Sequence, residues 1–352
     1  MDLCIYVWCV TLTNEKMGSN SPERQQLENS QNLFTRHPFA TIAILLTIFV
    51  LVFIPALELF LKTFSGLGNP PLYELSPLYG YMLKPNQVIE PRGNIAFLYG
   101  ARLTTNNLGL RAADDWDSKP AKKILFLGDS VTYGGQYVDD AQLFSSVAGN
   151  RLPGWQVGNG ACNAWGIGNI VGLLRDYRFL PAEVVVTNVI EGDFYRGTSR
   201  ASALPLWTER PRFALQDLLM HIMWKVNKTR YENSADAVIQ DEAHLDMIVD
   251  HAARNLKDLD HYLEQQQVRH FLFILPTRSQ IADGALPDPR IEKALKKYEI
   301  KAVYLLPELL SLEPDREKRQ KWFHDEVHLL PAGHQAYGLL IGDALLNVLS
   351  EN

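Results

Sequence analysis

Residues 124–130 read ILFLGDS, an apolar run that passes directly into Gly-Asp-Ser. A short apolar run bounded by charge and glycine is typical of a buried strand. We therefore predict a strand over Ile124–Leu127 that leaves Ser130 just beyond its carboxyl end, where open α/β sheets bind their ligands. Gly128 would relieve crowding at the sharp turn that follows the strand. Taken alone, the tripeptide fits an ordinary helix N-cap serine more readily than a nucleophile.

Four later runs have the character of the first, each being short, apolar and bounded by glycine, proline or charge. Helical periodicity separates them, most clearly in the apolar stripe that extends from Leu245 to Leu263. Strands that alternate with helices predict a parallel sheet covered on both faces. The further predicted strands are Trp155–Gly158, Val184–Val189, Phe271–Leu275 and Ala302–Leu305. We therefore expect an α/β domain over residues 121–352.

The composition is that of a globular protein rather than a disordered one. Of the 352 residues, 47% are hydrophobic and 21% are charged. The formal net charge is -6 and there is no block of lysine or arginine, so nothing favours a nucleic-acid partner. The three cysteines, Cys4, Cys9 and Cys162, do not form the pattern of a disulfide framework. We expect Cys162 to be a small buried residue.

A second strong signal is the run Phe39–Leu61, which reads FATIAILLTIFVLVFIPALELFL. No Asp, Glu, Lys or Arg occurs between Arg36 and Glu58, and the run has no polar face. About 20 apolar residues suffice for a helix to cross the hydrocarbon layer, so we predict a transmembrane helix over 39–61. The alternatives are a buried core helix and a cleaved signal peptide, although no small-residue cleavage site follows the run.

The charges that flank this run predict its orientation. Arg24 and Arg36 precede the run and Lys62 follows it, which weakly favours a cytoplasmic N-terminus and an extracytoplasmic main domain. We therefore expect a cytoplasmic tail over residues 1–38, in which either Met1 or Met17 could be the initiator. Residues 62–120 carry recurrent aromatic residues among glycines and prolines. We expect them to form a strand-containing extension that packs on the main domain.

Near the C-terminus, Asp325 and His328 stand three residues apart. On a tight turn or a first helical turn, this spacing lets the carboxylate reach the imidazole. A serine hydroxyl needs such a base, and a carboxylate fixes the tautomer of that base. The alternative is a surface Asp/His pair that caps the helix expected near Ala332. The competing histidines, His324 and His334, are weaker candidates because one precedes the aspartate and the other falls on that helix.

Taken together, Gly128-Asp129-Ser130 and Asp325-Glu326-Val327-His328 resemble the two end motifs of the SGNH (GDSL-like) hydrolases, in the right order. The resemblance covers about residues 122–350. It implies a flavodoxin-like three-layer α/β/α sandwich around a parallel five-stranded sheet. The preceding apolar helix and the stretch Asn107–Arg111 look like a bacterial membrane-anchored subgroup.

The resemblance also implies roles for individual residues. Ser130 would be the nucleophile, His328 its base and Asp325 the group that orients the base. The family's oxyanion hole uses the N–H of the serine, a glycine N–H after the second strand and an asparagine side chain after the third. The glycine matches Gly160. An ordinary glycine-rich loop is the alternative reading there.

The third family motif departs from the pattern. Residues 189–194 read VIEGDF, so Gly192 replaces the expected asparagine or that asparagine is deleted. Loss of one oxyanion donor typically lowers turnover by roughly 10²–10³. Asn163, in the loop after the second strand, is a candidate replacement, and Asn188 is a poorer one because it falls inside a strand. We expect Asp193, which matches the family's aspartate, to be structural or to line the substrate site.

These expectations describe a serine esterase or deacylase that hydrolyses O-acyl, and especially O-acetyl, esters on cell-envelope or exported polysaccharide. No cofactor and no metal site are expected, and the oligomeric state is left open. One alternative is a lysophospholipase or thioesterase that is held near its substrate by the membrane helix. Another is a weakly active protein that binds glycans or acts as an acyltransferase partner in an envelope assembly system.

Overall fold

The computed structural model describes residues 37–91, 100–112, 114–116, 122–176, 179, 182–199, 205–235 and 242–350. The chain divides into two compact units, Met1–Leu59 and Phe60–Asn352. Residues 1–36, which form most of the predicted cytoplasmic tail, lie outside the described residues, and Cys4 and Cys9 lie there with them.

The apolar run near the N-terminus forms one long helix, Pro38–Ser65. Its successive parts are α3 (Pro38–Ile48), η1 (Phe49–Phe53), α4 (Ile54–Phe60) and η2 (Leu61–Ser65). The 28 residues span about 42 Å at 1.5 Å per residue, against about 30 Å for the hydrocarbon layer. By length and composition this helix is able to cross a membrane, a test that a signal sequence also meets.

The second unit is built on a parallel five-stranded sheet with the order β6-β5-β7-β8-β9. The predicted sheet is therefore confirmed, and each strand lies within two residues of its expected bounds. The strand order places β5 between its successors, as in flavodoxin-like folds. The strands are β5 (Lys122–Gly128), β6 (Trp155–Asn159), β7 (Val184–Val189), β8 (Arg269–Ile274) and β9 (Ala302–Tyr304).

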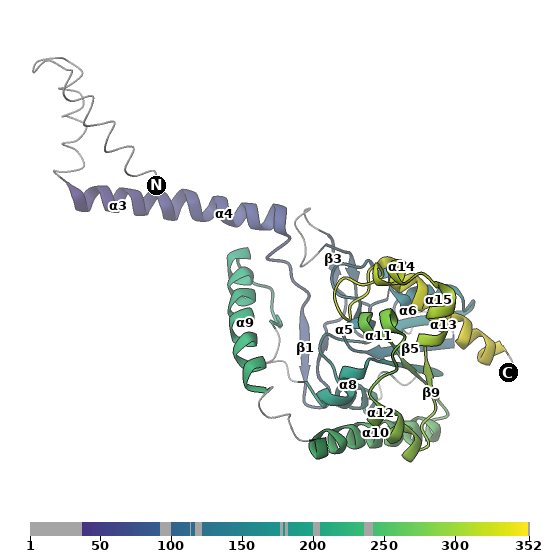
Figure 1. The fold of residues 1–352 in the computed structure, drawn as a ribbon. Helices are drawn as coiled ribbons and strands as arrows, with labels where there is room; N and C mark the ends of the chain where they lie inside the picture. Colours follow the sequence, from purple (N-terminus) through teal and green to yellow (C-terminus); the bar gives the residue numbers. More distant parts are fainter. Residues whose placement is uncertain are drawn as a thin grey trace, which may run out of the picture. The chain divides into compact units, whose positions relative to one another are not determined.

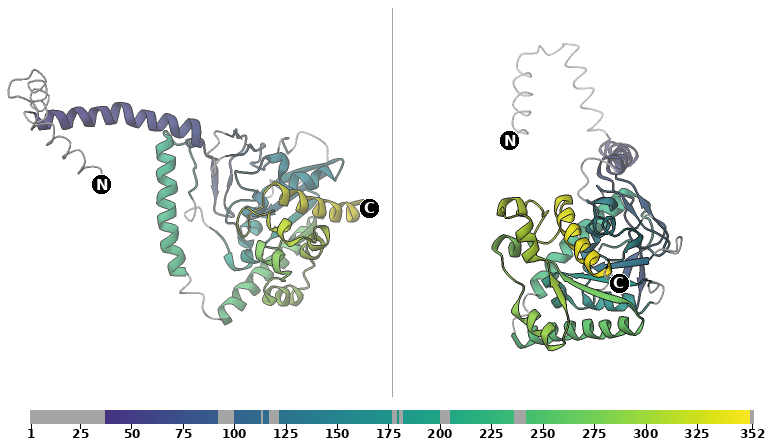
Figure 2. Two further views of the ribbon diagram at one scale, coloured as in Figure 1. Left: turned by 45° about the horizontal axis from the view of Figure 1, so that its top comes forward. Right: turned by 90° about the vertical axis from the view of Figure 1, so that its right-hand side faces the viewer.

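Helices cover both faces of this sheet because alternate residues of each strand point to opposite sides. Leu125 and Leu127 of β5 join one buried cluster, to which α7 (Ile167–Leu174) and α10 (Glu242–Gln265) contribute. Ile124 and Phe126 join the other cluster, with α6 (Phe144–Asn150) and α15 (Pro331–Ser350). Figures 1 and 2 show α10 and α15 on opposite sides of the sheet. The predicted three-layer arrangement is therefore confirmed.

Shorter elements lie at the edges of the two helical layers and in the connections. They are α5 (Ser130–Tyr133), η3 (Asp140–Gln142), α8 (Glu191–Arg196), α11 (Arg278–Asp283), α12 (Pro289–Lys297), α13 (Leu306–Leu312) and α14 (Arg316–Gln320). No described residue of one longer helix, α9 (Ala214–Ala235), belongs to either buried cluster.

The extension before the sheet contains two small antiparallel pairs. They are β1 (Tyr73–Ser76) with β2 (Gly80–Leu83), and β3 (Val88–Ile89) with β4 (Leu103–Thr104). This segment shares its core with the α/β body, because Tyr81 is fully buried and its carbonyl accepts the indole N–H of Trp165 at 3.0 Å. Residues 92–99, 113 and 117–121 lie outside the described residues.

Candidate active site

The turn after β5 places Ser130 at the first position of α5. Gly128 allows this turn, because a Cβ at that position would lie 2.1 Å from Thr132 Oγ1 and 2.5 Å from the Asn188 carbonyl oxygen. Asp129 is the N-cap residue, and its Oδ1 accepts the Val131 N–H at 2.9 Å. The N–H of Ser130 has no acceptor within the helix, because the first N–H groups of any helix lack one.

The segment before α15 brings His328 to this serine. His328 Nε2 lies 2.8 Å from Ser130 Oγ, and His328 Nδ1 lies 2.7 Å from Asp325 Oδ2. Asp325 is fixed by its own turn, since its Oδ1 accepts the N–H groups of Val327 at 2.9 Å and His328 at 2.8 Å. The structure therefore brings together the three residues that the sequence suggested as a Ser-His-Asp set.

Electrostatics favour the charged form of Asp325. Partial burial alone would raise the pKa of this carboxyl, but the hydrogen bonds from His328 and Val327 outweigh it and lower the pKa below its usual value. An ionised carboxylate at Nδ1 holds the proton of neutral histidine on that nitrogen. Nε2 is then the lone-pair nitrogen and can accept the proton of the serine hydroxyl.

The aromatic ring of Tyr137 lies beside His328. Its ring meets His328 edge-on with centroids 6.5 Å apart, and it lies 5.2 Å from the ring of His324. Burial, followed by the charges of Asp325 and Asp129, raises the pKa of Tyr137, so it remains a neutral phenol. His324 therefore packs against Tyr137, whereas His328 makes the hydrogen bond to Ser130.

His334 is fully buried on the other side of the nucleophile turn. Its Nδ1 accepts the Phe144 N–H at 3.1 Å, and its ring stacks on the ring of Phe144. This histidine therefore supports the packing of α15 on α6, whereas His328 makes the hydrogen bond to Ser130.

Arg111 of the extension fixes the loop that carries Tyr137. Its Nη1 donates to the carbonyls of Tyr133 and Gly135 at 2.6 and 2.8 Å, and its Nη2 donates to the carbonyl of Val138 at 2.9 Å. Its Nε donates to Asp140 Oδ1 at 2.9 Å, and the guanidinium is fully buried. A residue outside the α/β sheet thus orders the segment immediately after the nucleophile helix.

Gly160 does not occupy the predicted role of oxyanion donor. Its N–H donates to the Phe126 carbonyl at 2.9 Å and so extends the ladder between β6 and β5. Its Cα faces the core, where an added Cβ would lie 3.1 Å from Leu110 and Leu127. The expectation of a ligand-facing N–H at this residue is therefore corrected, because the strand register uses that N–H within the sheet.

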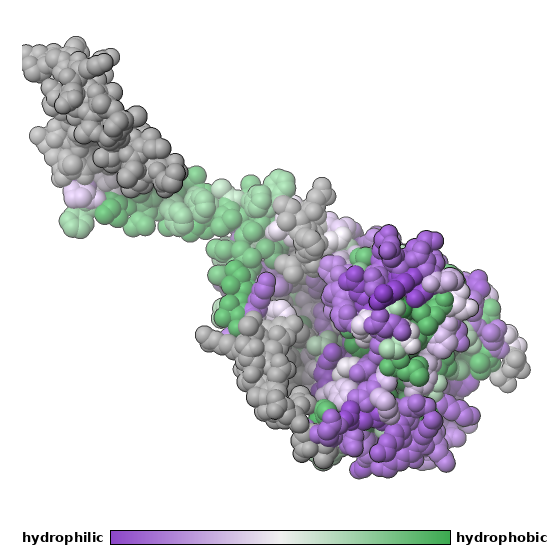
Figure 3. Space-filling view, viewed as in Figure 1, coloured by the Kyte–Doolittle hydropathy of each residue, from purple (hydrophilic) through white to green (hydrophobic). Residues whose placement is uncertain are grey.

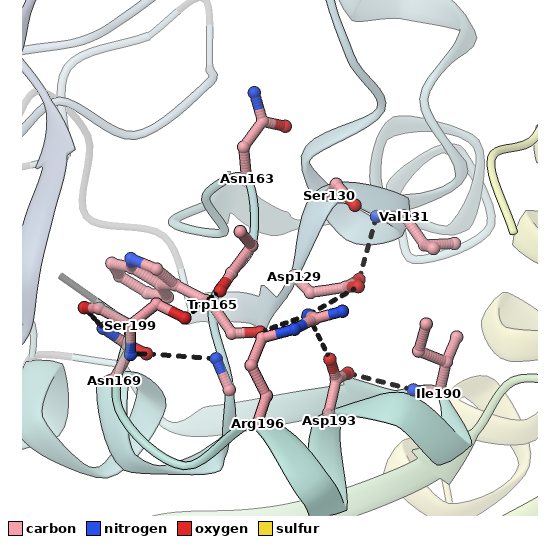
Figure 4. Close-up of polar contacts among 12 residues, drawn as sticks. Asp129, Ser130, Val131, Asn163, Trp165, Asn169, Ile190, Asp193, Arg196 and Ser199 are labelled. Atoms are coloured by element: carbon pink, nitrogen blue, oxygen red, sulfur yellow. Dashed lines mark hydrogen bonds and ion pairs between the residues drawn. The ribbon is translucent and has the colours of Figure 1, made fainter. Parts of the chain in front are cut away.

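The two asparagine candidates have different surroundings. Asn163 is half-buried in the loop after β6, and its carbonyl accepts the Tyr81 hydroxyl at 2.6 Å. Figure 4 shows its amide directed away from the cluster around Asp129. Asn188 is fully buried in β7, where its Nδ2 lies 3.3 Å from the carbonyls of Leu127 and Val186. The side chain of Asn163 is thus available to contact a bound molecule, whereas the side chain of Asn188 hydrogen-bonds within the sheet.

Gly192, at the position where the family pattern has an asparagine, adjoins open space. The nearest atoms to an added Cβ would be Arg196 Nη2 and Ile190 Cδ1, both at 3.8 Å. Its φ is not in the left-handed region. Local structure therefore does not require a glycine here.

Two buried aspartates, Asp129 and Asp193, and the partly exposed Arg196 form a charge cluster beneath the turn that carries Ser130 (Figure 4). Asp193 is fully buried, its Oδ1 accepts from Arg196 Nη1 at 2.8 Å and its Oδ2 accepts the Ile190 N–H at 3.0 Å. Arg196 Nη1 also donates to the Trp165 carbonyl at 2.8 Å and lies 3.5 Å from Asp129 Oδ2. Burial, and then the charge of Asp129, raise the pKa of Asp193. Asp193 therefore acts on the structure of the turn, and its burial speaks against a substrate-lining role.

Sequence reasoning missed three of these residues as parts of the site, Tyr137, Arg111 and Arg196. Arg111 was noted only as the end of a stretch typical of a subgroup. Arg196 follows Asp193 by three residues, the spacing of neighbours on one helical face, and that spacing was the available signal. Among the described residues, no group of three or more His, Cys, Asp or Glu side chains is placed to hold a metal ion.

An open groove of about 710 Å³ adjoins the site on the side of Gly192 and Val327. Eight of its fourteen lining residues have polar or charged side chains, and the other six are apolar. The other lining residues are Ile190, Glu191, Tyr195, Arg196, Thr277, Ser279, Gln280, Leu286, Pro287, Asp288, Pro289 and Arg290. Glu191 helps to shape its wall, since its Oε2 accepts from Gln280 Nε2 at 2.7 Å and from the Asp288 N–H at 3.1 Å.

Comparison with known proteins gives similarity at the level of structure alone. No protein-family model matches the chain, and no curated protein matches it significantly in sequence. A lipolytic protein of the G-D-S-L family from Veillonella parvula is 13% identical, with a TM-score of 0.37 over 66% of this chain and 100% of that one. A lipase/acylhydrolase from Enterococcus faecalis is 15% identical, with a TM-score of 0.36 over 64% and 96%.

An acetyl xylan esterase is 14% identical, with a TM-score of 0.38 over 64% of this chain and 98% of that one. Each of the three similarities covers nearly the whole of the solved chain and about two thirds of the present one. About one third of the present chain lies outside each of these similarities.

Proposed function

We propose that this chain is a serine esterase of the SGNH type in which Ser130 forms an acyl-enzyme. The observation that carries the proposal is the continuous hydrogen-bonded relay from Asp325 through His328 to Ser130, with heavy-atom distances of 2.7 and 2.8 Å. These distances meet the geometric requirement for a nucleophile activated by an oriented base.

In the proposed reaction, Ser130 Oγ attacks the ester carbonyl carbon while its proton passes to His328 Nε2. The bond from that carbon to the alcohol oxygen then breaks, and His328 returns the proton to the leaving alcohol. Water, deprotonated by His328, attacks the acyl-enzyme, and Ser130 leaves with its proton restored as the carboxylic acid is released. Asp325 stabilises the imidazolium in both steps.

We propose short O-acyl groups on a carbohydrate, and especially O-acetyl groups on envelope or exported polysaccharide, as the substrate. The groove beside Gly192 offers side chains such as Arg196, Thr277 and Ser279, which suit sugar hydroxyls. A lysophospholipase or thioesterase would need an extended apolar surface for its acyl chain. Faster hydrolysis of p-nitrophenyl palmitate than of p-nitrophenyl acetate would favour that alternative.

A second candidate function is a weakly active domain that binds glycans or passes an acyl group to a sugar hydroxyl. It is favoured by the glycine at position 192 and by the engagement of the Gly160 N–H within the sheet. Both observations leave the oxyanion with fewer donors than an efficient esterase uses, at a typical loss of roughly 10²–10³ in turnover.

The test is to label the full chain in mild detergent with a fluorophosphonate probe and to locate the adduct by mass spectrometry. We expect an adduct on Ser130, loss of labelling in Ser130→Ala, and much slower labelling in His328→Ala. Ser279→Ala is the matched control, since it removes an exposed serine of the adjoining groove. An unlabelled wild-type protein, or unchanged labelling of Ser130→Ala, would contradict the esterase proposal.

A further inference from the structure

Helix α9 carries an apolar stripe that the rest of the described structure leaves exposed. Leu219, Ile222, Met223 and Val226 recur at the spacing of one helical face, and each is about half or more exposed, with Met223 at 63%. We refer to these four residues as the α9 stripe. Figure 3 shows hydrophobic surface along the first part of α9, in contrast to the hydrophilic surface over much of the α/β body.

The opposite face of α9 is fixed to the protein through Asp217. Asp217 is fully buried and accepts the Gly68 N–H at 3.0 Å and the Trp207 indole N–H at 2.8 Å. At 100° per residue, Asp217 and His221 lie on the side of the helix opposite the stripe. The hydrogen bonds of Asp217 therefore direct the α9 stripe away from the rest of the α/β domain.

This attachment places the start of α9 beside the end of the apolar helix. Gly68 follows the last residue of that helix, Ser65, by three residues, and an added Cβ at Gly68 would lie 3.3 Å from Ala214. Helix α9 also packs against η2, the last turn of the apolar helix. The α9 stripe begins five residues after Ala214, about 8 Å further along the helix axis.

We propose that the α9 stripe contacts the same lipid bilayer that the apolar helix crosses. If Phe39–Leu61 spans the hydrocarbon layer, then η2 lies at the bilayer surface and holds the start of α9 there. A helix with one apolar face at that depth inserts its apolar side chains at the boundary between headgroups and acyl chains. The inference rests on the proposed membrane span and does not depend on esterase activity.

A second contact to the bilayer has a consequence for the attached domain. One helix alone permits the domain to rotate and tilt about its end, whereas a helix and a surface contact together hold it in one orientation. The α9 stripe and the apolar helix together would therefore set which way the domain faces relative to the membrane.

The experiment uses the full chain, with Cys4 and Cys9 replaced by serine, reconstituted into vesicles. A bimane label is attached through Met223→Cys, and in a control through Leu286→Cys, which is equally exposed at 63% but lies in the groove beside the site. Cys162 is buried and stays in place. The vesicles contain lipids with a nitroxide quencher near the top of the acyl chain.

We expect the label at position 223 to be quenched at least about twofold while the label at position 286 is unaffected, as bilayer contact at the stripe alone requires. Equal, weak quenching at both positions in vesicles that carry the protein would overturn the proposal. A disulfide between two copies of the unlabelled Met223→Cys variant under an added oxidant, together with no quenching of the labelled protein, would assign the stripe to a second copy instead. Protein that does not float with the vesicles would refute the membrane span itself, and fluorophosphonate labelling would still report separately on Ser130.

Discussion

Gly192 is the residue at which the site differs most from the pattern of the SGNH hydrolases that the sequence resembles. The structure gives no local reason for a glycine, since its φ is not left-handed and a Cβ would meet nothing closer than 3.8 Å. The fold therefore leaves room for a side chain at this position.

We predict that Gly192→Asn increases esterase turnover. The amide would add a hydrogen-bond donor at the family position, and a single such donor is worth roughly 10²–10³ where it is well placed. A tenfold or larger rise in kcat for p-nitrophenyl acetate is expected, with little change in KM. Gly192→Ala, which adds volume without a donor, is the control and should leave kcat unchanged. Equal effects of the two substitutions would show that position 192 does not face the oxyanion.

A second residue-scale prediction concerns His334 and acid stability. Burial, followed by the nearby charges of Arg111 and His328, lowers the pKa of His334 to about 3. The unfolded chain, with a histidine pKa of about 6.5, therefore binds a proton that the folded chain does not between these two pH values. Protonation thus favours unfolding, and stability should fall by up to about 1.4 kcal/mol per pH unit as the pH decreases through this window.

His334→Asn removes the titrating group and keeps an acceptor near the Phe144 N–H. We expect the variant to be less stable at pH 7 and to show a shallower decline in unfolding free energy between pH 6 and pH 4. Urea denaturation in mild detergent at several pH values measures both slopes. Parallel slopes for wild type and variant would mean that another group causes the acid sensitivity.

At the scale of elements, the extension before the sheet takes part in the site. Arg111 crosses from it to the loop between α5 and η3, where three carbonyls and Asp140 surround its guanidinium. Tyr81 reaches in the same way to the carbonyl of Asn163. Both loops that border Ser130 are therefore held by residues from outside the five-stranded sheet.

We predict that Arg111→Met destabilises the protein strongly. The change would leave the carbonyls of Tyr133, Gly135 and Val138 buried without their donor and Asp140 without its cation. Removal of one partner from such a buried set costs about 3–5 kcal/mol. Thermal unfolding of the full chain should show the loss. As a comparison, Arg102→Met changes a largely exposed arginine and should shift stability by less than about 0.5 kcal/mol.

Local patterns were enough to predict the sheet and the contacts that join Asp325, His328 and Ser130. Apolar runs identified all five strands, and the Asp325 to His328 spacing follows from a turn that closes on itself. The acceptor of the Gly160 N–H could not be predicted from local patterns, because it depends on the register between β5 and β6. The hydrogen-bond acceptors of Arg111 could not be predicted either. They are backbone carbonyls, which every residue carries, so no residue type in the sequence identifies them.

At the scale of the whole molecule, a helix able to cross a membrane precedes the α/β domain. In that domain a groove adjoins the hydrogen-bonded pair of Ser130 and His328. A domain that acts on envelope or exported polysaccharide must lie on the outer side of that membrane. The flanking charges, with Arg24 and Arg36 before the run and Lys62 after it, favour this orientation.

We predict that alkaline phosphatase fused after Asn352 is active in cells, because that enzyme needs the oxidising outer compartment for its disulfides. The same reporter fused before Met1 should be inactive. A fluorescent protein that folds only in the cytoplasm should give the reverse pattern at the two ends. Active phosphatase at the N-terminal end would place the domain inside the cell and remove the polysaccharide proposal.

The packing of Trp116 and Leu110 over Gly158 has a practical consequence. A Cβ at Gly158 would lie 2.5 Å from the indole and 2.7 Å from Leu110, so both side chains rest directly on β6. Expression clones that begin at Lys122, the first residue of the sheet, would lack Trp116 and Leu110. The apolar surface of β6 would then be exposed, and the protein would be prone to form inclusion bodies. Clones that begin at Gly66 retain both residues and offer the better starting point for crystallisation without the N-terminal helix.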